Sequence, residues 1–223
     1  MIPARGGSKR LPKKNILPLD TKPLVSYSIE VASECDAIDG VVVSSDSRAI
    51  LEIAKEYKDV EALQRAEELA TDTASSIDVL LDVMQHSKKY DYIVLLQPTS
   101  PLRTQVHLQE AIELLFQKEA QSVVSVCEME HSPLWSNTLD SSLSMEHFLR
   151  EDVKGKRSQD LECYYRLNGA IYICAWEQFH QERSFFLKKG TFAYIMSKRD
   201  SIDIDEELDF LLAETIMKEK KRC

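Results

Sequence analysis

Residues 92–104 read YIVLLQPTSPLRT, and they show a pattern that recurs along the chain. A largely apolar run of strand length comes first, as in strands that are buried on both faces. Two prolines then shape a loop. After the loop, apolar residues recur at helical spacing, at Leu108, Ala111, Ile112 and Leu115. A strand, a loop and a helix in this order form one unit of an α/β sheet.

Similar units occur from end to end. Apolar runs of strand length occupy residues 41–44, 92–96, 122–126, 169–173 and 192–196. Apolar stripes of helical period follow Pro23, Asp46, Ser75 and Ser76, and another begins at Leu208. This alternation predicts a largely parallel sheet. With 223 residues, a single domain spanning 1–223 accounts for the chain.

Composition excludes several classes of function. The formal charge is −9, with 37 acidic and 28 basic residues, so no general attraction to nucleic acid or anionic lipid is expected. No apolar run approaches the ~18 to 20 residues that span a bilayer. The five cysteines form no CxxC pair and are typical of reduced thiols. We therefore expect a cytoplasmic protein that binds neither nucleic acid nor membranes.

Residues 132–162 interrupt the alternation. This stretch is polar and aperiodic, with scattered large apolar residues at Trp135, Phe148 and Leu149. It is either a loose surface insertion or an arm that packs on a second subunit. We favour the arm, because so long a linker inside a compact domain is uncommon.

The opening loop, residues 2–15, reads IPARGGSKRLPKKN. Gly6 and Gly7 let backbone amides approach a ligand closely, and the flanking cations can neutralise a triphosphate. The spacing matches neither the Walker A loop nor the dinucleotide fingerprint. A solvated charge run is the alternative, but the glycines and Pro12 favour a shaped phosphate-binding loop.

A second motif, SIDID, covers residues 201–205. If the segment is extended, Asp203 and Asp205 share one face while Ile202 and Ile204 point into the core. Two carboxylates on one face suit Mg²⁺, which binds one or two carboxylates together with phosphate oxygens. The alternative is an acidic cap for the final helix. The alternation with isoleucine favours the metal site.

A third motif is LLQPTSPLRT, residues 95–104. Its loop follows a buried strand, at the edge where open α/β sheets bind ligands. Gln97 is therefore placed to hydrogen-bond a substrate. Taken alone, the motif is also compatible with an ordinary turn.

With these motifs in view, the chain resembles the CMP-sialic acid synthetases, also called N-acylneuraminate cytidylyltransferases. The resemblance runs from end to end and in family order. It rests on IPARGGSKRLPKKN (2–15), RAEELATDTASS (65–76), LLQPTSPLRT (95–104), SVVSVCEMEH (122–131), YRLNGAIYI (165–173) and SIDIDEELDF (201–210).

The resemblance implies a fold and a set of site residues. The fold is a Rossmann-like, mostly parallel sheet with helices on both faces and a protruding dimerisation arm, which makes a homodimer. The implied nucleotide-binding residues are Arg5, Ser8, Lys9, Lys14, Asn15, Arg65 and Ser76. Lys14 and Arg5 have the catalytic role of offsetting phosphate charge, and Asp203 and Asp205 bind Mg²⁺. The implied sugar-acid contacts are Gln97, Arg166, Asn168, Tyr172, Phe185 and Phe186.

The implied reaction is transfer of CMP from CTP to the anomeric hydroxyl of a nonulosonic acid, with release of pyrophosphate. N-acetylneuraminate is the favoured acid, and legionaminate or a related acid is the alternative. The eight-carbon acid KDO is less favoured. A homologue that binds CTP or sugar without turnover is the contrasting class, but retention of Lys14, Asp203 and Asp205 favours an enzyme.

Two departures from the family accompany the resemblance. Family members often carry a lysine near Trp135 and an arginine near Ser158, and Lys156 or Arg157 is a candidate replacement. They also carry several apolar residues before the proline that matches Pro3, where this sequence has Met1 and Ile2. We therefore expect the first strand to be incomplete.

Overall fold

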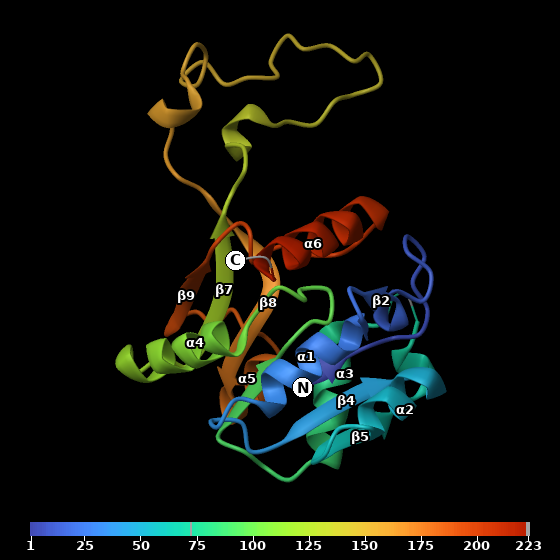
Figure 1. Ribbon diagram of the computed structural model, residues 1–223. Helices are drawn as coiled ribbons and strands as arrows, with labels where there is room; N and C mark the ends of the chain where they lie inside the picture. The colour runs from blue at the N-terminus through green and yellow to red at the C-terminus, as the bar shows by residue number, and fades with distance from the viewer. Residues whose placement is uncertain (72, 222–223) are drawn as a thin grey trace.

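The computed structural model describes residues 1–71 and 73–221, and a sheet in two parts forms its centre (Figure 1). Asp72 and Cys223, which belong to the sequence patterns above, lie outside the described residues. The first part has the order β1 (Ile2–Pro3), β4 (Val41–Ser45) and β5 (Val60–Gln64), and its strands are parallel. The second has the order β6 (Tyr92–Leu95), β8 (Tyr165–Ala175), β7 (Ser122–Glu128) and β9 (Thr191–Met196). A short hairpin pairs β2 (Pro18–Leu19) with β3 (Lys22–Pro23).

Met1 joins the two parts of the sheet. Its terminal amine donates a hydrogen bond of 2.7 Å to the Val94 carbonyl, and its own carbonyl accepts one of 3.0 Å from the Leu96 N–H. This pattern is that of parallel neighbours. The combined order is therefore β5-β4-β1-β6-β8-β7-β9, in which β8 alone of the described strands runs antiparallel to both its neighbours.

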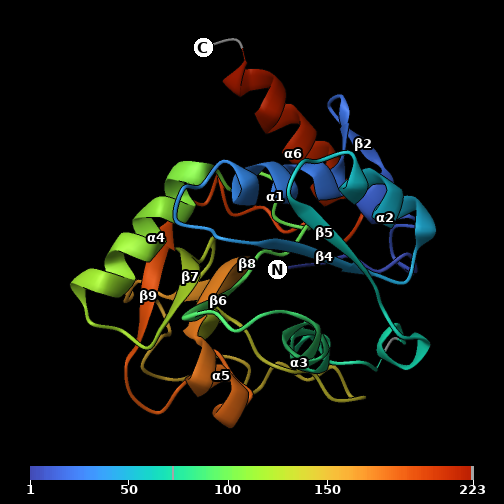
Figure 2. The same ribbon diagram turned by 90° about the horizontal axis from the view of Figure 1, so that it is seen from below.

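Helices cover both faces of this sheet, as the resemblance implies (Figure 2). One face carries α1 (Leu24–Ser33), α2 (Arg48–Lys55) and α4 (Gln105–Gln117), and the other carries α3 (Ser76–His86) and α5 (Trp176–Glu182). The last helix, α6 (Glu207–Lys220), contacts the β2–β3 hairpin region through a small apolar cluster. The mostly parallel α/β fold is thus confirmed. The described helices include none that is long and apolar enough to cross a membrane.

The predicted strands are all present, and β7 and β8 extend beyond the predicted ends. The sequence analysis missed β5 and α5. The residues of β5 read VEALQ and are half-buried or exposed, so this edge strand lacks a continuous apolar run. The α5 helix has only 7 residues, which is too short to show a clear helical period.

Residues 132–162 leave the body between β7 and β8 and extend away from it (Figure 1). This segment, called the arm below, is mostly irregular, with single 3₁₀ turns at η3 (Pro133–Trp135) and η4 (Ser158–Asp160). Trp135, Phe148 and Leu149 are half-buried. Leu143 and Met145 are more exposed, at 69% and 59%. The protrusion agrees with the predicted arm, and its part in dimerisation stays a prediction.

Candidate functional site

A pocket of about 610 Å³ lies where the loops after β1 and β6 meet the end of β5. Its position at the carboxyl ends of parallel strands is the usual ligand site of open α/β sheets. The structure brings together here every predicted nucleotide- and metal-binding residue, together with Gln97. The lining residues of this kind are Arg5, Ser8, Lys9, Lys14, Asn15, Arg65, Ser76, Gln97, Asp203 and Asp205. Their binding roles stay predictions.

The opening loop has a defined shape, in agreement with the sequence analysis. The Gly6 N–H donates a 2.8 Å hydrogen bond to the Asp46 carboxylate. A Cβ at Gly6 would lie 2.8 Å from the Ser47 Cβ, so only glycine fits this close approach. The Asn15 side-chain amide donates to the Arg5 carbonyl at 2.9 Å and closes the loop from its other end.

Lys14 connects this loop to the segment before α6. Its side chain is buried, and its ammonium donates to the Ile204 carbonyl and lies 3.2 Å from Oδ1 of Asp205. Arg10 reaches the other oxygen of the same carboxylate at 2.9 Å. The Asp205 carboxylate therefore holds two loop cations at the pocket wall.

The SIDID segment has the predicted alternation. Asp203 and Asp205 line the pocket, while Ile204 is fully buried and donates its N–H to the Thr99 carbonyl at 2.7 Å. Ile202 packs against the same apolar cluster as Ile204. The segment is not part of a strand. The carboxylates of Asp203 and Asp205 nevertheless lie on the same side of the segment, as they would in a strand.

Asp203 is the more deeply placed of the two carboxylates. Burial raises the pKa of its side chain, and the nearby charge of Asp205 adds to the rise, whereas a hydrogen bond from Thr99 and the charge of Lys14 oppose it. Within the described residues, its Oδ1 is buried and has no hydrogen-bond partner. A divalent cation would give this unpartnered oxygen a ligand contact.

The donor set limits the kind of cation. The described residues contain no group of three or more His, Cys, Asp or Glu side chains that could hold a metal. A transition-metal site of several protein ligands does not fit this pattern. A pair of carboxylates beside a phosphate site suits Mg²⁺, which completes its shell with phosphate oxygens and water.

Arg65 forms the opposite wall. Its Nη2 donates to the Ser44 carbonyl at 2.7 Å, and its Nε donates to the Ser44 hydroxyl at 3.2 Å. Burial lowers the pKa of its guanidinium, and its hydrogen bonds to Ser44 go to neutral groups. Ser76 stands nearby at the first turn of α3, behind the cap residue Ser75. This wall therefore offers an anchored cation and a hydroxyl.

Gly169 was not recognised as a site residue. Its φ is 73°, and a Cβ there would lie 2.6 Å from Oε1 of Gln97 and 3.5 Å from Oδ2 of Asp203. The glycine thus lets the β6 loop and the SIDID segment approach each other over β8. A glycine inside an apolar strand run was the available signal, because it often marks a close approach.

Arg103 is a second residue that the sequence analysis missed. It is fully buried, and it donates to the carbonyls of Ala170 at 2.8 Å and Gln97 at 3.3 Å, and to the Ser28 hydroxyl. Burial lowers the pKa of its guanidinium to about 9. These bonds fix the loop after β6 against β8, so Arg103 is a positioning residue for Gln97.

The other predicted sugar-acid residues do not join Gln97. Among the described residues, the pocket lining includes none of Arg166, Asn168, Tyr172, Phe185 and Phe186. Their sugar-binding role stays a prediction.

Two of these side chains are interior. Asn168 is fully buried, and its amide donates to the Ser201 hydroxyl at 2.9 Å and accepts from the Ser125 hydroxyl at 2.6 Å. Phe185 is buried in the core, with its ring 4.8 Å from that of Phe179. Both side chains therefore hold β8 and its neighbours together in this structure.

The remaining three lie closer to solvent. Arg166 pairs with Glu130 at 3.0 Å and reaches toward the Ser201 carbonyl. Tyr172 is half-buried with its ring 5.4 Å from that of Phe185, and burial raises the pKa of its phenol. Phe186 is 55% exposed. Arg166 and Tyr172 lie on β8, and the charge of the pocket residue Asp203 helps to raise the pKa of both side chains.

Comparison with known proteins adds independent evidence. A family model described as Cytidylyltransferase matches residues 1–216. The chain is 37% identical to the CMP-N,N'-diacetyllegionaminic acid synthase of Legionella pneumophila, over 97% of this chain and 94% of that protein. It is 33% identical to the pseudaminic acid cytidylyltransferase of Campylobacter jejuni, over 98% and 95%.

A further group of relatives is longer. The chain is 40% identical to the N-acylneuraminate cytidylyltransferase of Streptococcus agalactiae serotype V, over 95% of this chain. That match covers 51% of the relative, so the chain spans about half the length of this protein.

A solved structure shares the fold. It is that of CMP:2-keto-3-deoxy-manno-octonic acid synthetase complexed with CTP, with a TM-score of 0.72 over 98% of this chain and 97% of the other. The sequence identity is 16%, so this likeness bears on architecture alone.

Proposed function

Because this chain belongs to the cytidylyltransferase family, we propose that it transfers CMP from CTP to the anomeric hydroxyl of a nonulosonic acid and releases pyrophosphate. The relatives named above support the class of acceptor, since their names refer to N-acylneuraminate, diacetyllegionaminic acid and pseudaminic acid. The observation that carries the proposal is the meeting of the cationic loop and the two aspartates in one pocket.

The loop residues bind the triphosphate in this proposal. Arg5, Ser8 and Lys9 surround the phosphates, and the backbone of the Gly6 turn lets them come close. Lys14 is held in place by Asp205 and by the Ile204 carbonyl, so it needs little reorganisation to offset charge at the α-phosphate. Arg65 and Ser76 contact the rest of the nucleotide.

Asp203 and Asp205 are the residues that would hold Mg²⁺. When bound, the ion offsets charge on the phosphates and helps pyrophosphate to leave. Gln97, fixed by Arg103 and Gly169, orients the sugar acid toward the α-phosphate. The anomeric oxygen then attacks phosphorus in line with the departing pyrophosphate. Positioning and electrostatics supply most of the rate enhancement.

N-acetylneuraminate is the acceptor we favour, and N,N'-diacetyllegionaminate is the second candidate. The N-acylneuraminate relative is 40% identical and the legionaminic acid relative 37%, which supports both. A non-catalytic homologue is less favoured, because a ligand-binding protein has no need for a metal-binding carboxylate that is costly to bury.

The proposal extends to assembly and location. We propose a homodimer that forms through the arm, which carries exposed apolar residues including Leu139, Leu143 and Met145. Exposed apolar side chains that gather on one protrusion are typical of an interface. We place the protein in the cytoplasm, in keeping with the free thiols of the described cysteines.

A pyrophosphate-release assay tests the function. The purified chain is given CTP and Mg²⁺ with N-acetylneuraminate, N,N'-diacetyllegionaminate, pseudaminate or KDO in turn. We expect release only with a nonulosonic acid, and none without acid or after chelation of Mg²⁺. Turnover of KDO alone would reject the proposed acceptor class. CTP binding by calorimetry without turnover of any acid would identify a binding protein.

A further inference from the structure

Two buried contacts hold the SIDID segment, one on each side of Asp203. After Asp203, the Ile204 N–H donates to the Thr99 carbonyl at 2.7 Å, and Ile204 is fully buried. Before Asp203 stands Ser201, which is also fully buried. Ser201 is not among the described residues that line the pocket. It can therefore affect a bound ligand only through the protein around it.

The Ser201 hydroxyl makes two hydrogen bonds. It donates to the Ser197 carbonyl at 2.7 Å, across the turn that precedes the segment, and it accepts from the Asn168 side-chain amide at 2.9 Å. A serine hydroxyl has a single proton to donate. Because the Ser197 carbonyl takes that proton, the Asn168 nitrogen must be the donor of the second bond.

Asn168 connects Ser201 to the centre of the sheet. Its Oδ1 accepts from the Ser125 hydroxyl at 2.6 Å and from the Ala170 N–H at 3.2 Å. The backbone N–H can only donate, so it fixes the amide with its oxygen toward Ala170 and its nitrogen toward Ser201. The Ser125 hydroxyl accepts in turn from the Ile171 N–H at 2.7 Å. These bonds lie where β7 and β8 shift register, so side chains replace part of the regular ladder there.

The three side chains form one chain of hydrogen bonds from β7 to the SIDID segment. Ser125, Asn168 and Ser201 are each fully buried. A buried network of this kind stiffens the structure around it, because breaking any of its bonds leaves an unpaired polar group away from water. Asp203 lies two positions after Ser201, so the network restrains the backbone that carries this carboxylate.

We propose that Ser201 is a positioning residue for the divalent cation. The inference rests on the proposed function, in which Asp203 holds Mg²⁺. The Ser201 hydroxyl, held by Asn168, fixes the backbone before Asp203, so that the unpartnered Oδ1 of that carboxylate meets the ion without rearrangement. Mg²⁺ demands nearly ideal octahedral geometry, so a small displacement of one ligand lowers its affinity. Asn168 acts through Ser201, a role that needs no contact with the sugar acid.

Binding of Mn²⁺ alone, without CTP or sugar acid, tests this role. Mn²⁺ prefers the same oxygen ligands as Mg²⁺, and its unbound fraction is measured by electron paramagnetic resonance. We expect Ser201→Ala to raise the Kd for Mn²⁺ about 10-fold, as the loss of a hydrogen bond behind a metal ligand commonly does. Ser201→Cys keeps the volume but bonds weakly, and it should raise the Kd as well. The Mg²⁺ concentration that gives half-maximal turnover rises by a similar factor.

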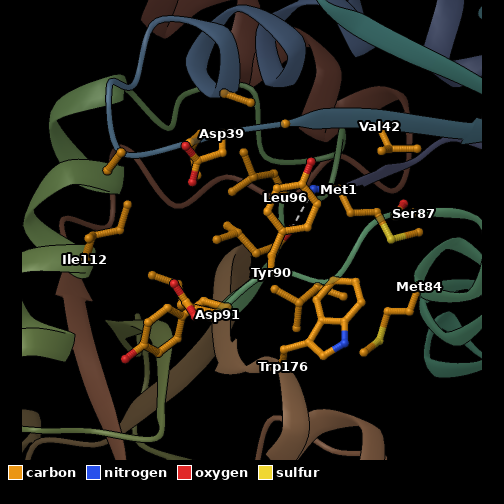
Figure 3. Close-up of a pocket in the computed structure, with 18 of the residues that line it drawn as sticks. Met1, Asp39, Val42, Met84, Ser87, Tyr90, Asp91, Leu96, Ile112 and Trp176 are labelled. Carbon is orange, nitrogen blue, oxygen red and sulfur yellow. Dashed lines mark hydrogen bonds between the residues drawn. The ribbon is translucent and has the colours of Figure 1, made fainter.

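Two control variants measure what a general loss of stability does. Ser26→Ala removes a hydroxyl from a residue that is 1% exposed and that hydrogen-bonds the Tyr57 side chain. Met84→Ala enlarges a second cavity, of about 300 Å³, which lies away from the proposed site and has Met84 and Trp176 in its wall (Figure 3). We expect both variants to lower the Tm and to leave the Kd for Mn²⁺ unchanged.

The variant Asp203→Asn shows which of the two proposals has failed. Equal Mn²⁺ binding by this variant and the unmodified chain, or no measurable binding by either, would remove the metal site and the inference with it. If Asp203→Asn loses the ion while both Ser201 variants keep the unmodified Kd, the metal site stands and the role of Ser201 is overturned. A rise in Kd with Met84→Ala as large as that with Ser201→Ala would also overturn it, because loss of stability would then be the cause.

Discussion

The ammonium of Lys14 lies 3.2 Å from Oδ1 of Asp205, although 191 positions separate the two residues in the chain. The contact joins the glycine loop to the segment before α6. Lys14 also donates to the Ile204 carbonyl, which fixes its long side chain at the pocket wall. The cationic loop and the carboxylates therefore form one site, and changes on either side affect the other.

Lys14→Met removes this ammonium while keeping a side chain of similar length. We expect kcat to fall by about 10²- to 10³-fold, because a preorganised charge at the reacting phosphate is lost. Steady-state kinetics with CTP and N-acetylneuraminate measure the change. The matched control is Lys55→Met, which removes an exposed lysine on α2 and leaves kcat unchanged. Equal kcat in the two variants would contradict a catalytic role for Lys14.

The variant Asp203→Asn is expected to change stability and activity in different ways. The buried carboxylate has a raised pKa, so its charged form costs free energy at neutral pH, and this cost disappears as the pH falls through the raised value. We expect the amide to leave the Tm equal or higher while Mg²⁺-dependent turnover falls at least about 100-fold. Thermal unfolding measures the Tm, and steady-state kinetics over a range of Mg²⁺ concentrations measure the turnover. Normal turnover would show that Asp203 is not an essential metal ligand.

Asp205→Asn has a different expected signature. The change removes the ion pairs with Arg10 and Lys14, but the carboxylate side chain is 42% exposed, so the loss of stability is at most about 1 kcal/mol. Turnover falls, because both a metal ligand and the anchor of Lys14 are lost. A rise in the KM for CTP should accompany the lower kcat. An unchanged KM for CTP would argue against coupling between this carboxylate and the loop.

Gly169→Ala tests the close approach of Gln97 and Asp203. The φ of 73° makes any Cβ strained, at a cost of about 1–2 kcal/mol, and here the Cβ also meets Oε1 of Gln97. Gly190→Ala is the control, because its φ is 79° and its nearest neighbour lies at 3.3 Å. We expect both variants to lose stability and only Gly169→Ala to lose turnover. Equal turnover in the two would remove Gly169 from the site.

The pH dependence of stability reports on the Met1 amine. Its pKa is about 5 in the folded state against 8.0 for the ordinary amine, so below pH 8 the unfolded chain binds a proton that the folded chain does not. Stability is then full above pH 8 and falls by up to about 4 kcal/mol as the pH drops to 5. Urea unfolding of the chain and of its N-acetylated form, which lacks the titrating amine, at pH 8.5 and 5.5 measures the difference. Identical pH dependence in both would show that the amine is not the cause.

The exposed apolar residues of the arm predict the oligomeric state of the protein. We expect a dimer by light scattering at micromolar concentration, and a shift toward monomer on Leu143→Asp, because a charge replaces the apolar side chain of a residue that is 69% exposed in the single chain. Val106→Asp, at a similarly exposed position on α4, is the control and keeps the dimer. A monomer in the unmodified chain would remove the dimer proposal.

Much of the fold follows from local patterns. The strands at 41–44 and 122–126 and the helices α1 to α4 were predicted, because the apolar period of a strand or helix is visible in neighbouring residues, and the structure has strands at Val41–Ser45 and Ser122–Glu128. The glycine–lysine loop and the alternation in SIDID were likewise readable, since they depend on residue type and spacing alone. The edge strand β5 was missed because an exposed strand needs no apolar run.

The sequence by itself thus determined most of the strands and helices, though not β5 and α5, and it pointed to the short motifs that we propose for phosphate and metal binding. Only the tertiary structure decided that β8 runs antiparallel through the sheet, that Asn168 and Phe185 are interior, and that Gly169 and Arg103 position Gln97. It also decided that the two parts of the sheet meet at Met1 beside a cavity. The physical reason is that the periodic spacing of apolar side chains depends only on neighbouring residues. Strand partners, burial and cavities depend instead on contacts between segments that lie far apart in the chain.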